Sequence, residues 1–239
     1  MKAVDDVSLA VPRGAIAGLI GPNGAGKSTL FNIIAGVLKP SSGEVSLRGV
    51  PVHREPAHRR MRHGLGRTFQ IPRPFPAMTV LENVLTASTE QSGERLFANF
   101  LPGRHIELEE RSNTDKAMAL LDFATLAKLA NAPARELSGG QRKLLELARV
   151  LMADPEIILL DEPAAGVNPA LIEVIIERIA EINRRGVTFL IIEHNMGLVA
   201  RLCDDVFALA QGRLIACGTP AQVVRDAGVI EAYLGGSAA

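Results

Sequence analysis

The sequence predicts an α/β fold in which a mainly parallel β-sheet has helices on both faces. The first observation is a set of short, strongly apolar segments of strand length, each followed by a segment with helical spacing of its apolar residues. The second is a glycine-rich turn that separates the first of these strands from the first helix. We therefore expect one domain over residues 1–239, with a core at 1–76 and 137–239 and an inserted helical subdomain at about 77–136.

The first elements of the core lie before residue 50. Partial alternation in VDDVSLAV, residues 4–11, predicts an edge strand, and the continuous apolar run AIAGLI, residues 15–20, predicts a strand buried on both faces. The pattern LFNIIAGVL after the glycine-rich turn predicts a helix that ends before Pro40. The segment GEVSLRG predicts a further short strand.

A stiff loop then separates the core from a helical region. Pro72, Pro74 and Pro76 each push the preceding residue towards extended geometry. Three- and four-residue apolar spacing in TVLENVLTAS and NTDKAMALLDFATLAKLA predicts helices, whereas the segment between them is ambiguous.

The alternation of strand and helix resumes after residue 137. The expected elements are a helix to about 153, the strand 157–160, a helix 169–185, the strand 188–192, a helix through 202, two strands joined at Gly212, and a short C-terminal helix. Strands that alternate with helices indicate parallel pairing, and the two strands at Gly212 add an antiparallel element.

Charge, hydropathy and cysteine content exclude several classes. The formal net charge is zero, with 26 basic and 26 acidic residues, so no nucleic-acid partner is expected. No apolar run approaches the roughly 18 residues that cross a bilayer, and MKAVDDV has no apolar region typical of a signal peptide. Cys203 and Cys217 form no CxxC pair and are predicted to be free thiols in a reducing compartment, the cytoplasm by default.

The glycine-rich turn has the pattern of a phosphate-binding loop. GPNGAGKS, Gly21 to Ser28, fits G-x-x-x-x-G-K-[ST] between a buried strand and a helix. Backbone N–H groups and the helix N-terminus would hold phosphate oxygens, Lys27 would contact the β- and γ-phosphates, and Ser28 would bind Mg²⁺. A purely structural glycine turn is the alternative. A dinucleotide fingerprint fits less well, because Thr29 stands where a third glycine or alanine belongs. The predicted contact residues are Gly21, Pro22, Asn23, Gly24, Ala25, Gly26, Lys27, Ser28 and Thr29.

Polar residues follow three other predicted strands. Asp161 and Glu162 end the apolar run IILL, where Asp161 suits Mg²⁺ and Glu162 suits a general base, although two solvated acids are the alternative. Gln70 follows LGRTF and His194 follows TFLIIE. Spacing alone leaves the roles of Gln70 and His194 open.

Five motifs in order resemble those of the ATP-binding-cassette (ABC) ATPases. GPNGAGKST, Gln70, LSGGQ at 137–141, IILLDEP and His194 are similar to the Walker A loop, Q-loop, signature, Walker B and switch histidine of that superfamily. The resemblance implies a P-loop NTPase domain of ABC type that hydrolyses ATP with Mg²⁺. It implies catalytic roles for Glu162, His194, Lys27 and Gln70, Mg²⁺ ligation by Ser28, Gln70 and Asp161, and nucleotide contacts from Ser138, Gly139, Gly140 and Gln141.

A finer resemblance concerns transport. RTFQIPRPFPAMTVLENV, LLDEPAAGVNP, IIEHNMGLVARLCD and GTPAQVVRDAGVIEAYLG are similar to the ATPase subunits of branched-chain amino acid importers. Urea or amide importers, the ATPase of lipopolysaccharide export and non-transport ABC proteins are the alternatives. The resemblance implies a second ATPase subunit and a membrane permease as partners, an indirect periplasmic or extracellular substrate-binding protein, and a position at the cytoplasmic face of the membrane. Phe75 is a candidate permease contact, or else fills the subdomain junction.

The signature segment implies a shared site. In the family, Ser138 and Gly140 would face the phosphate loop of a second copy, so that two chains pack head to tail around ATP. Asn168 stands where relatives have a D-loop aspartate, which implies a weaker link across the dimer. In the family, the aromatic residue on which adenine stacks lies just before the stretch that matches KAVDDVSL, and within the given sequence no aromatic residue precedes Phe31.

Overall fold

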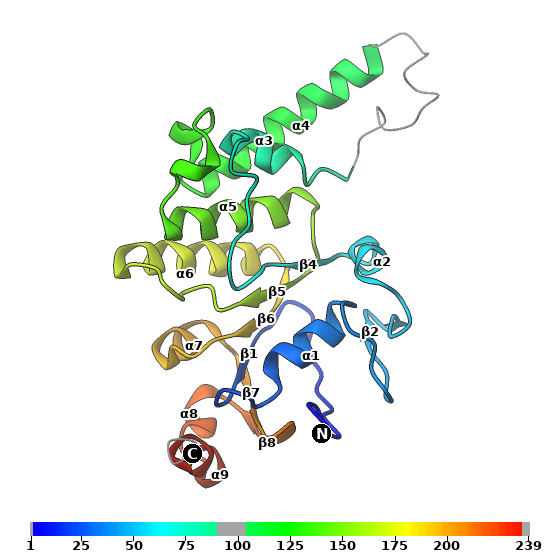
Figure 1. The fold of residues 1–239 in the computed structure, drawn as a ribbon, viewed down its shortest axis with the longest axis vertical. Coiled ribbons are helices and arrows are strands. Elements are labelled where there is room, and N and C mark those ends of the chain that lie inside the picture. Colours follow the sequence, from blue (N-terminus) through cyan, green and yellow to red (C-terminus); the bar gives the residue numbers. More distant parts are fainter. Residues whose placement is uncertain (1, 90–103, 236–239) are drawn as a thin grey trace. The chain divides into compact units, whose positions relative to one another are not determined.

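The computed structural model describes residues 2–89 and 104–235 and divides into two compact units (Figure 1). The first unit comprises Met1–Gln70, Pro155–Ala165 and Ile179–Ala239, and the second comprises Ile71–Asp154 and Gly166–Arg178. The second unit is larger than the predicted subdomain of 77–136. It is larger because helix α5 (Gly139–Met152), expected in the core, packs against α3 (Val80–Leu85) and α4 (Arg104–Phe123).

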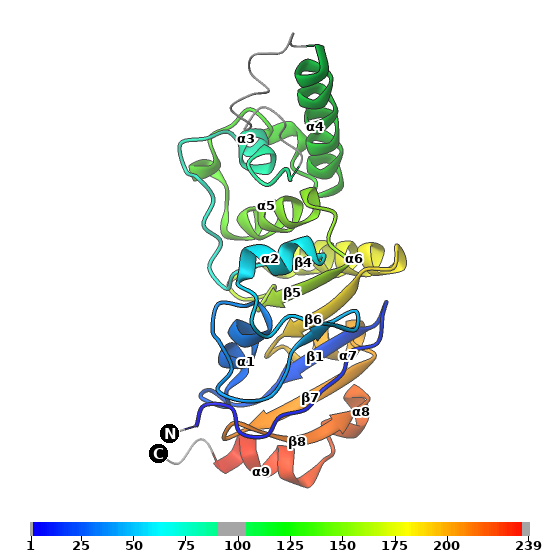
Figure 2. The same cartoon turned by 90° about the vertical axis from the view of Figure 1, so that its right-hand side faces the viewer.

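The first unit is built on a six-stranded sheet with the order β4-β5-β6-β1-β7-β8. All neighbours pair in parallel except β7 and β8, which are antiparallel and joined through Gln211 and Gly212, both with positive φ. The strands predicted for this sheet after residue 14 are confirmed with small shifts in their ends, and Figure 2 shows them side by side. The strands are β1 (Ile16–Ile20), β4 (Leu65–Arg67), β5 (Ile157–Asp161), β6 (Thr188–Ile192), β7 (Asp205–Ala210) and β8 (Arg213–Gly218).

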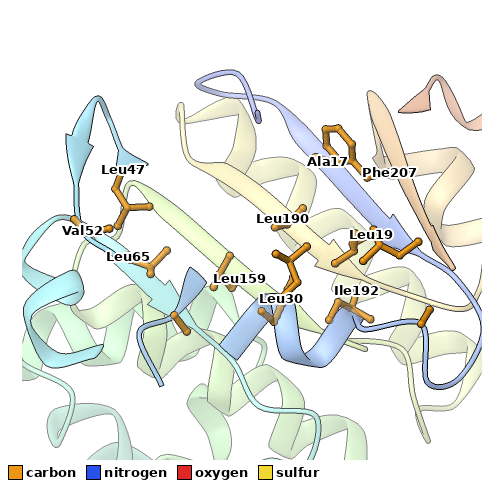
Figure 3. Packing of buried hydrophobic residues seen from close by; sticks show 14 residues of the cluster. Ala17, Leu19, Leu30, Leu47, Val52, Leu65, Leu159, Leu190, Ile192 and Phe207 are labelled. Atoms are coloured by element: carbon orange, nitrogen blue, oxygen red, sulfur yellow. The ribbon is translucent and has the colours of Figure 1, made fainter. Parts of the chain in front are cut away.

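The central strand β1 is buried on both faces, as its continuous apolar sequence predicts. Ala17 and Leu19 belong to a cluster that joins the sheet to α1 (Lys27–Ile34) (Figure 3). On the other face, a Cβ at Gly18 would lie 3.1 Å from Sγ of Cys203, next to α7 (Met196–Leu202). Cys203 and Cys217 are both free, and burial raises the pKa of the Cys203 thiol to about 12.

Smaller elements complete the first unit. Arg60 of α2 (Ala57–Arg62) is buried and donates through Nη1 to the carbonyls of Ile33 and Ile34, both at 2.6 Å. These carbonyls lie at the C-terminal end of α1, where backbone acceptors have no partner within the helix. The remaining elements are β2 (Ser46–Leu47), β3 (Val50–Pro51), α8 (Pro220–Val223) and α9 (Ala227–Gly235), so the predicted single C-terminal helix is two.

The predicted edge strand at residues 4–11 is wrong, because this segment has no strand pairing. Val7, Leu9 and Val11 are partly buried against the core cluster, so their spacing reflects burial without a sheet partner. Near its start, the N–H of Asp5 donates to the Gly212 carbonyl at 2.7 Å, and the Asp5 carboxylate accepts from Arg213 at the same distance. The segment is therefore anchored to the β7–β8 turn.

The second unit is helical. Thr79 and Glu82 form a capping box at the start of α3, and the buried amide of Asn83 bonds both backbone groups of Phe75. This fixes the proline-rich loop onto α3. Helices α3 and α4 lie in the two segments whose spacing predicts helices. Of the ambiguous segment between them, 90–110, residues 90–103 lie outside the described residues and residues 104–110 belong to α4. Short 3₁₀ helices occur at Ala127–Leu129 and Ala134–Glu136, and α6 (Pro169–Arg184) begins in this unit.

Candidate active site

Four parallel strands of the first unit each lead directly to a predicted site residue. β1 leads to the phosphate loop, β4 to Gln70, β5 to Asp161 and Glu162, and β6 to the segment with His194. In open parallel sheets, ligands bind beyond the carboxyl ends of the strands. The topology thus brings these residues to one edge.

The phosphate loop requires its glycines. Gly26 caps α1 with φ 101°, and a Cβ there would lie 2.4 Å from the Ala3 carbonyl oxygen. Gly21 has φ 145°, and a Cβ there would lie 2.1 Å from the Leu209 carbonyl oxygen. No side chain caps α1, and Ser28 in its first turn is exposed. A helix start of this kind fits a bound phosphate.

Lys27 is buried inside this loop. Its Nζ donates to the carbonyl oxygens of Gly21 at 2.6 Å and Pro22 at 2.9 Å. Burial lowers the pKa of the ammonium, while the negative charges of Glu162 and Asp161 oppose that shift. A phosphate would add negative charge beside a cation that is now held only by neutral carbonyls and those two acids.

The Glu162 side chain contacts two side chains that follow other strands of the sheet. Nε2 of Gln70 donates to its Oε2 at 2.8 Å, and Nε2 of His194 lies 2.9 Å from its Oε1. Its backbone has φ 48°, a left-handed conformation that is rare for a residue with a Cβ and that concentrates at functional sites. Glu162 is therefore in contact with both Gln70 and His194, two other residues with predicted catalytic roles.

Sequence reasoning missed Glu193, which precedes His194. Its buried carboxylate accepts from the backbone N–H groups of Ala164 at 2.9 Å, His194 at 2.8 Å and Asn195 at 2.9 Å. It therefore joins the segment after Glu162 to the segment that carries His194. An acid directly after the apolar run FLII was the available signal.

Arg67 was missed as well. Its Nη2 lies 3.7 Å from Oδ2 of Asp161, and its Nη1 donates to Oδ1 of Asn32 at 2.8 Å. Its guanidinium also lies over the Phe69 ring, 5.5 Å from the centroid. Burial lowers the pKa of Arg67, and the charge of Asp161 opposes that shift. The predicted Mg²⁺ ligand Asp161 thus has a cationic neighbour on the adjacent strand.

The phosphate loop borders a cavity of 1230 Å³, and the side chains that contact one another at Glu162 line the same cavity. Its lining includes Pro22–Thr29, Gln70, Glu162 and His194, together with residues of the N-terminal segment, the β7–β8 turn and α9. Among the described lining residues there is no Phe, Tyr or Trp.

The signature residues lie in the second unit, where they start α5. Oγ of Ser138 accepts from the N–H of Gln141 at 3.3 Å, and Oε1 of Gln141 accepts from the N–H of Ser138 at 2.9 Å. A Cβ at Gly140 would lie 3.2 Å from Val167, whereas Gly139 has room. Asn168 accepts from the N–H of Leu171 at 2.9 Å near the start of α6. Each polar side chain here thus has a local capping contact.

Comparisons with known proteins identify the family. The model of the ABC transporter family matches residues 4–165. The chain belongs to the ABC transporter family. A second model, of the branched-chain amino acid ATP-binding cassette transporter, matches residues 213–239. The fold and the resemblance predicted from the five motifs are confirmed.

Individual relatives of this ABC chain cover almost its whole length. The probable branched-chain amino acid transport ATP-binding protein LivG of Archaeoglobus fulgidus is 42% identical over 98% of this chain and 90% of its own. The ADP conformation of an ABC transporter cassette has a TM-score of 0.83 at 38% identity and covers 98% of this chain and 92% of its own. A dimeric post-hydrolysis cassette bound to ADP and Pi has a TM-score of 0.74 at 26% identity and covers 91% and 90%.

The described residues lack two features. Within 2–89 and 104–235, no helix is long and apolar enough to traverse a lipid bilayer. Within the same residues, no three His, Cys, Asp or Glu side chains are grouped so that they could hold a metal ion.

Proposed function

We propose that this chain is the ATP-hydrolysing subunit of an importer for branched-chain amino acids. The observation that carries the proposal is the contact of Glu162 with Gln70 and His194 in the cavity that contains the phosphate loop. Phosphoryl transfer needs positioning and charge compensation more than covalent chemistry. An acid with a left-handed backbone that contacts Gln70 and His194 beside a phosphate loop fits that need.

Each residue has a role that its position supports. The N–H groups of Gly24 to Thr29 and the start of α1 would hold the phosphates, and Lys27 would place its charge on the β- and γ-phosphates. Glu162 would accept a proton from the attacking water, and His194 would donate to the γ-phosphate. Glu193 holds the backbone that carries His194 and so fixes its place.

The residues also fit a magnesium ion. Ser28 is exposed at the start of α1. Asp161 is the last residue of β5, and Gln70 follows β4 at the same edge of the sheet. These residues would hold the ion through oxygen atoms, the ligand type that Mg²⁺ prefers. When bound, Mg²⁺ would neutralise charge on the phosphates.

The signature segment supports a dimer that shares its sites. Ser138, Gly139, Gly140 and Gln141 start a 14-residue helix, and a helix start favours an anion. We assign this helix start to the ATP of a second copy, as in the head-to-tail arrangement the family implies. Asn168 would contribute to the same interface without a charge.

The transport assignment rests on the relatives. The A. fulgidus relative is named for branched-chain amino acid transport, and the second family model carries the same description. The chain would act at the cytoplasmic face of the membrane, bound to a separate permease that receives its cargo from a substrate-binding protein. ATP would close the dimer, and hydrolysis would open it.

Lys27→Ala tests the nucleotide site. The full chain should bind a fluorescent ATP analogue and release phosphate with Mg²⁺, and Lys27→Ala should lose both because one buried cation is removed. Lys39→Ala, outside the cavity lining, is the matched control. Unchanged ATP affinity in Lys27→Ala would overturn the phosphate-loop assignment. Uptake of labelled leucine by cells that express the chain with its permease tests the substrate.

A further inference from the structure

We propose that the C-terminal helix α9 is part of the nucleotide site and that Tyr233 is a positioning residue for the phosphate loop. The N–H of Gly21, the first residue of the loop, donates to Oη of Tyr233 at 2.9 Å. The two residues are 212 positions apart in the chain. This inference rests on the proposed ATPase function, since it concerns the same site.

Gly21 depends on this contact because of where it lies. It follows the last residue of β1, it is buried, and its φ of 145° lets it approach the Leu209 carbonyl of β7. A buried backbone N–H that leaves a strand ladder needs another partner. The Tyr233 hydroxyl is that partner.

The two backbone groups of Gly21 have different fates when a nucleotide binds. Its carbonyl accepts from Nζ of Lys27, a donor for which a phosphate would compete. Its N–H is engaged by Tyr233, which does not carry a charge that a phosphate would attract. Burial raises the pKa of the tyrosine hydroxyl, so it remains neutral. When Lys27 turns to the phosphate, Tyr233 is therefore the contact that keeps Gly21 in place.

Other residues of α9 border the same cavity. Gly228, Glu231 and Ala232 line it together with Pro22 to Thr29, and their spacing of three and four places them on one side of the helix. Val229 is buried and fixes the helix on the first unit, where α9 packs against β7 and β8. Helix α9 thus forms part of the cavity wall and also contacts Gly21, the first residue of the phosphate loop.

Tyr233→Phe tests the role, since it removes the hydroxyl and keeps the ring. The affinity for a fluorescent ADP analogue is expected to fall about threefold to tenfold, the effect of one hydrogen bond. The reason is that an unpaired Gly21 N–H lets the loop leave its binding conformation, which lowers the apparent affinity in proportion. Ile230→Ala is the control, because Ile230 lies on the same helix, is exposed and does not line the cavity.

The outcomes separate this inference from the proposed function. Wild-type affinity in Tyr233→Phe, or an equal loss in Ile230→Ala, would overturn the role of Tyr233 and leave the ATPase proposal intact. Failure of the wild-type chain to bind ADP would overturn both. Hydrogen exchange of residues 227–235 in the wild-type chain gives a second readout that needs no variant. ADP should slow exchange there, and an unchanged rate would contradict the inference.

Discussion

Replacing Glu162 with glutamine should separate hydrolysis from binding. The side chain keeps its shape and its contacts: its oxygen can accept from Gln70, and its amide can donate to Nε2 of His194 in the matching tautomer. The free energy of unfolding should therefore change by no more than about one hydrogen bond, 0.5–1.5 kcal/mol. Loss of a general base lowers the rate about 10²- to 10⁴-fold, which corresponds to about 2.7–5.4 kcal/mol of barrier.

Three assays test Glu162→Gln: phosphate release measures hydrolysis, binding of a fluorescent ATP analogue measures affinity, and size-exclusion chromatography measures dimer formation. Glu162→Gln with Mg²⁺ and ATP should bind nucleotide at least as tightly as the wild-type chain, because a negative charge near Lys27 is removed. It should also elute as a dimer. Glu44→Gln, an exposed change outside the cavity, should behave as wild type in all three assays. Hydrolysis by Glu162→Gln within threefold of wild type would refute its role as base, and a monomer with ATP would refute the shared site.

Two further predictions concern charge. The folded pKa of Lys27 lies below its ordinary 10.5, so the unfolded chain binds more protons between these values and the Lys27 contribution to the free energy of unfolding rises with pH there. Because a phosphate binds the charged ammonium form of Lys27, ATP affinity should fall as pH rises through the lowered pKa. Lys27→Arg should remove this pH dependence. A wild-type ATP affinity that stays constant up to pH 10.5 would contradict the prediction. Arg67→Met leaves the largely buried Asp161 without this cation and should cost about 3 kcal/mol in urea unfolding, whereas a loss under 0.5 kcal/mol would contradict the pairing.

The parts of the fold that sequence predicted are those that local chemistry determines. Strands β1, β5 and β6 are continuous apolar runs because both of their faces are buried, and this signal needs no knowledge of partners. The glycines of the phosphate loop are required by close backbone approaches, which a motif records. The segment at 4–11 has the same alternation as a strand, yet its apolar residues are buried without pairing. A two-residue period of apolar residues indicates that one side of an extended segment is buried. It does not distinguish a strand paired in a sheet from an unpaired segment.

Contacts between distant segments account for what was missed in the site. Glu193 is an acid like many others until its carboxylate is seen to accept three backbone N–H groups from two segments. Tyr233 lies in a weakly patterned C-terminal helix, and only the fold brings its hydroxyl to Gly21. Neither residue belongs to the motifs that carry the chemistry. Their function is to hold the backbone of residues that do.

The contacts of Glu162 also explain how the site could respond to ATP. In the structure, Gln70 and His194 both bond the Glu162 carboxylate, which as the proposed base would face the attacking water molecule. Under the proposed roles, Gln70 would help to hold Mg²⁺ and His194 would donate to the γ-phosphate, so both partners would leave Glu162 only when the complete nucleotide is present. Gln70 and His194 would each exchange one polar contact for another, and the attacking water molecule would take their place at the Glu162 carboxylate. Gln70 directly precedes Ile71, the first residue of the second unit. A change in the hydrogen-bond partner of Gln70 would therefore also affect the backbone that continues into Ile71.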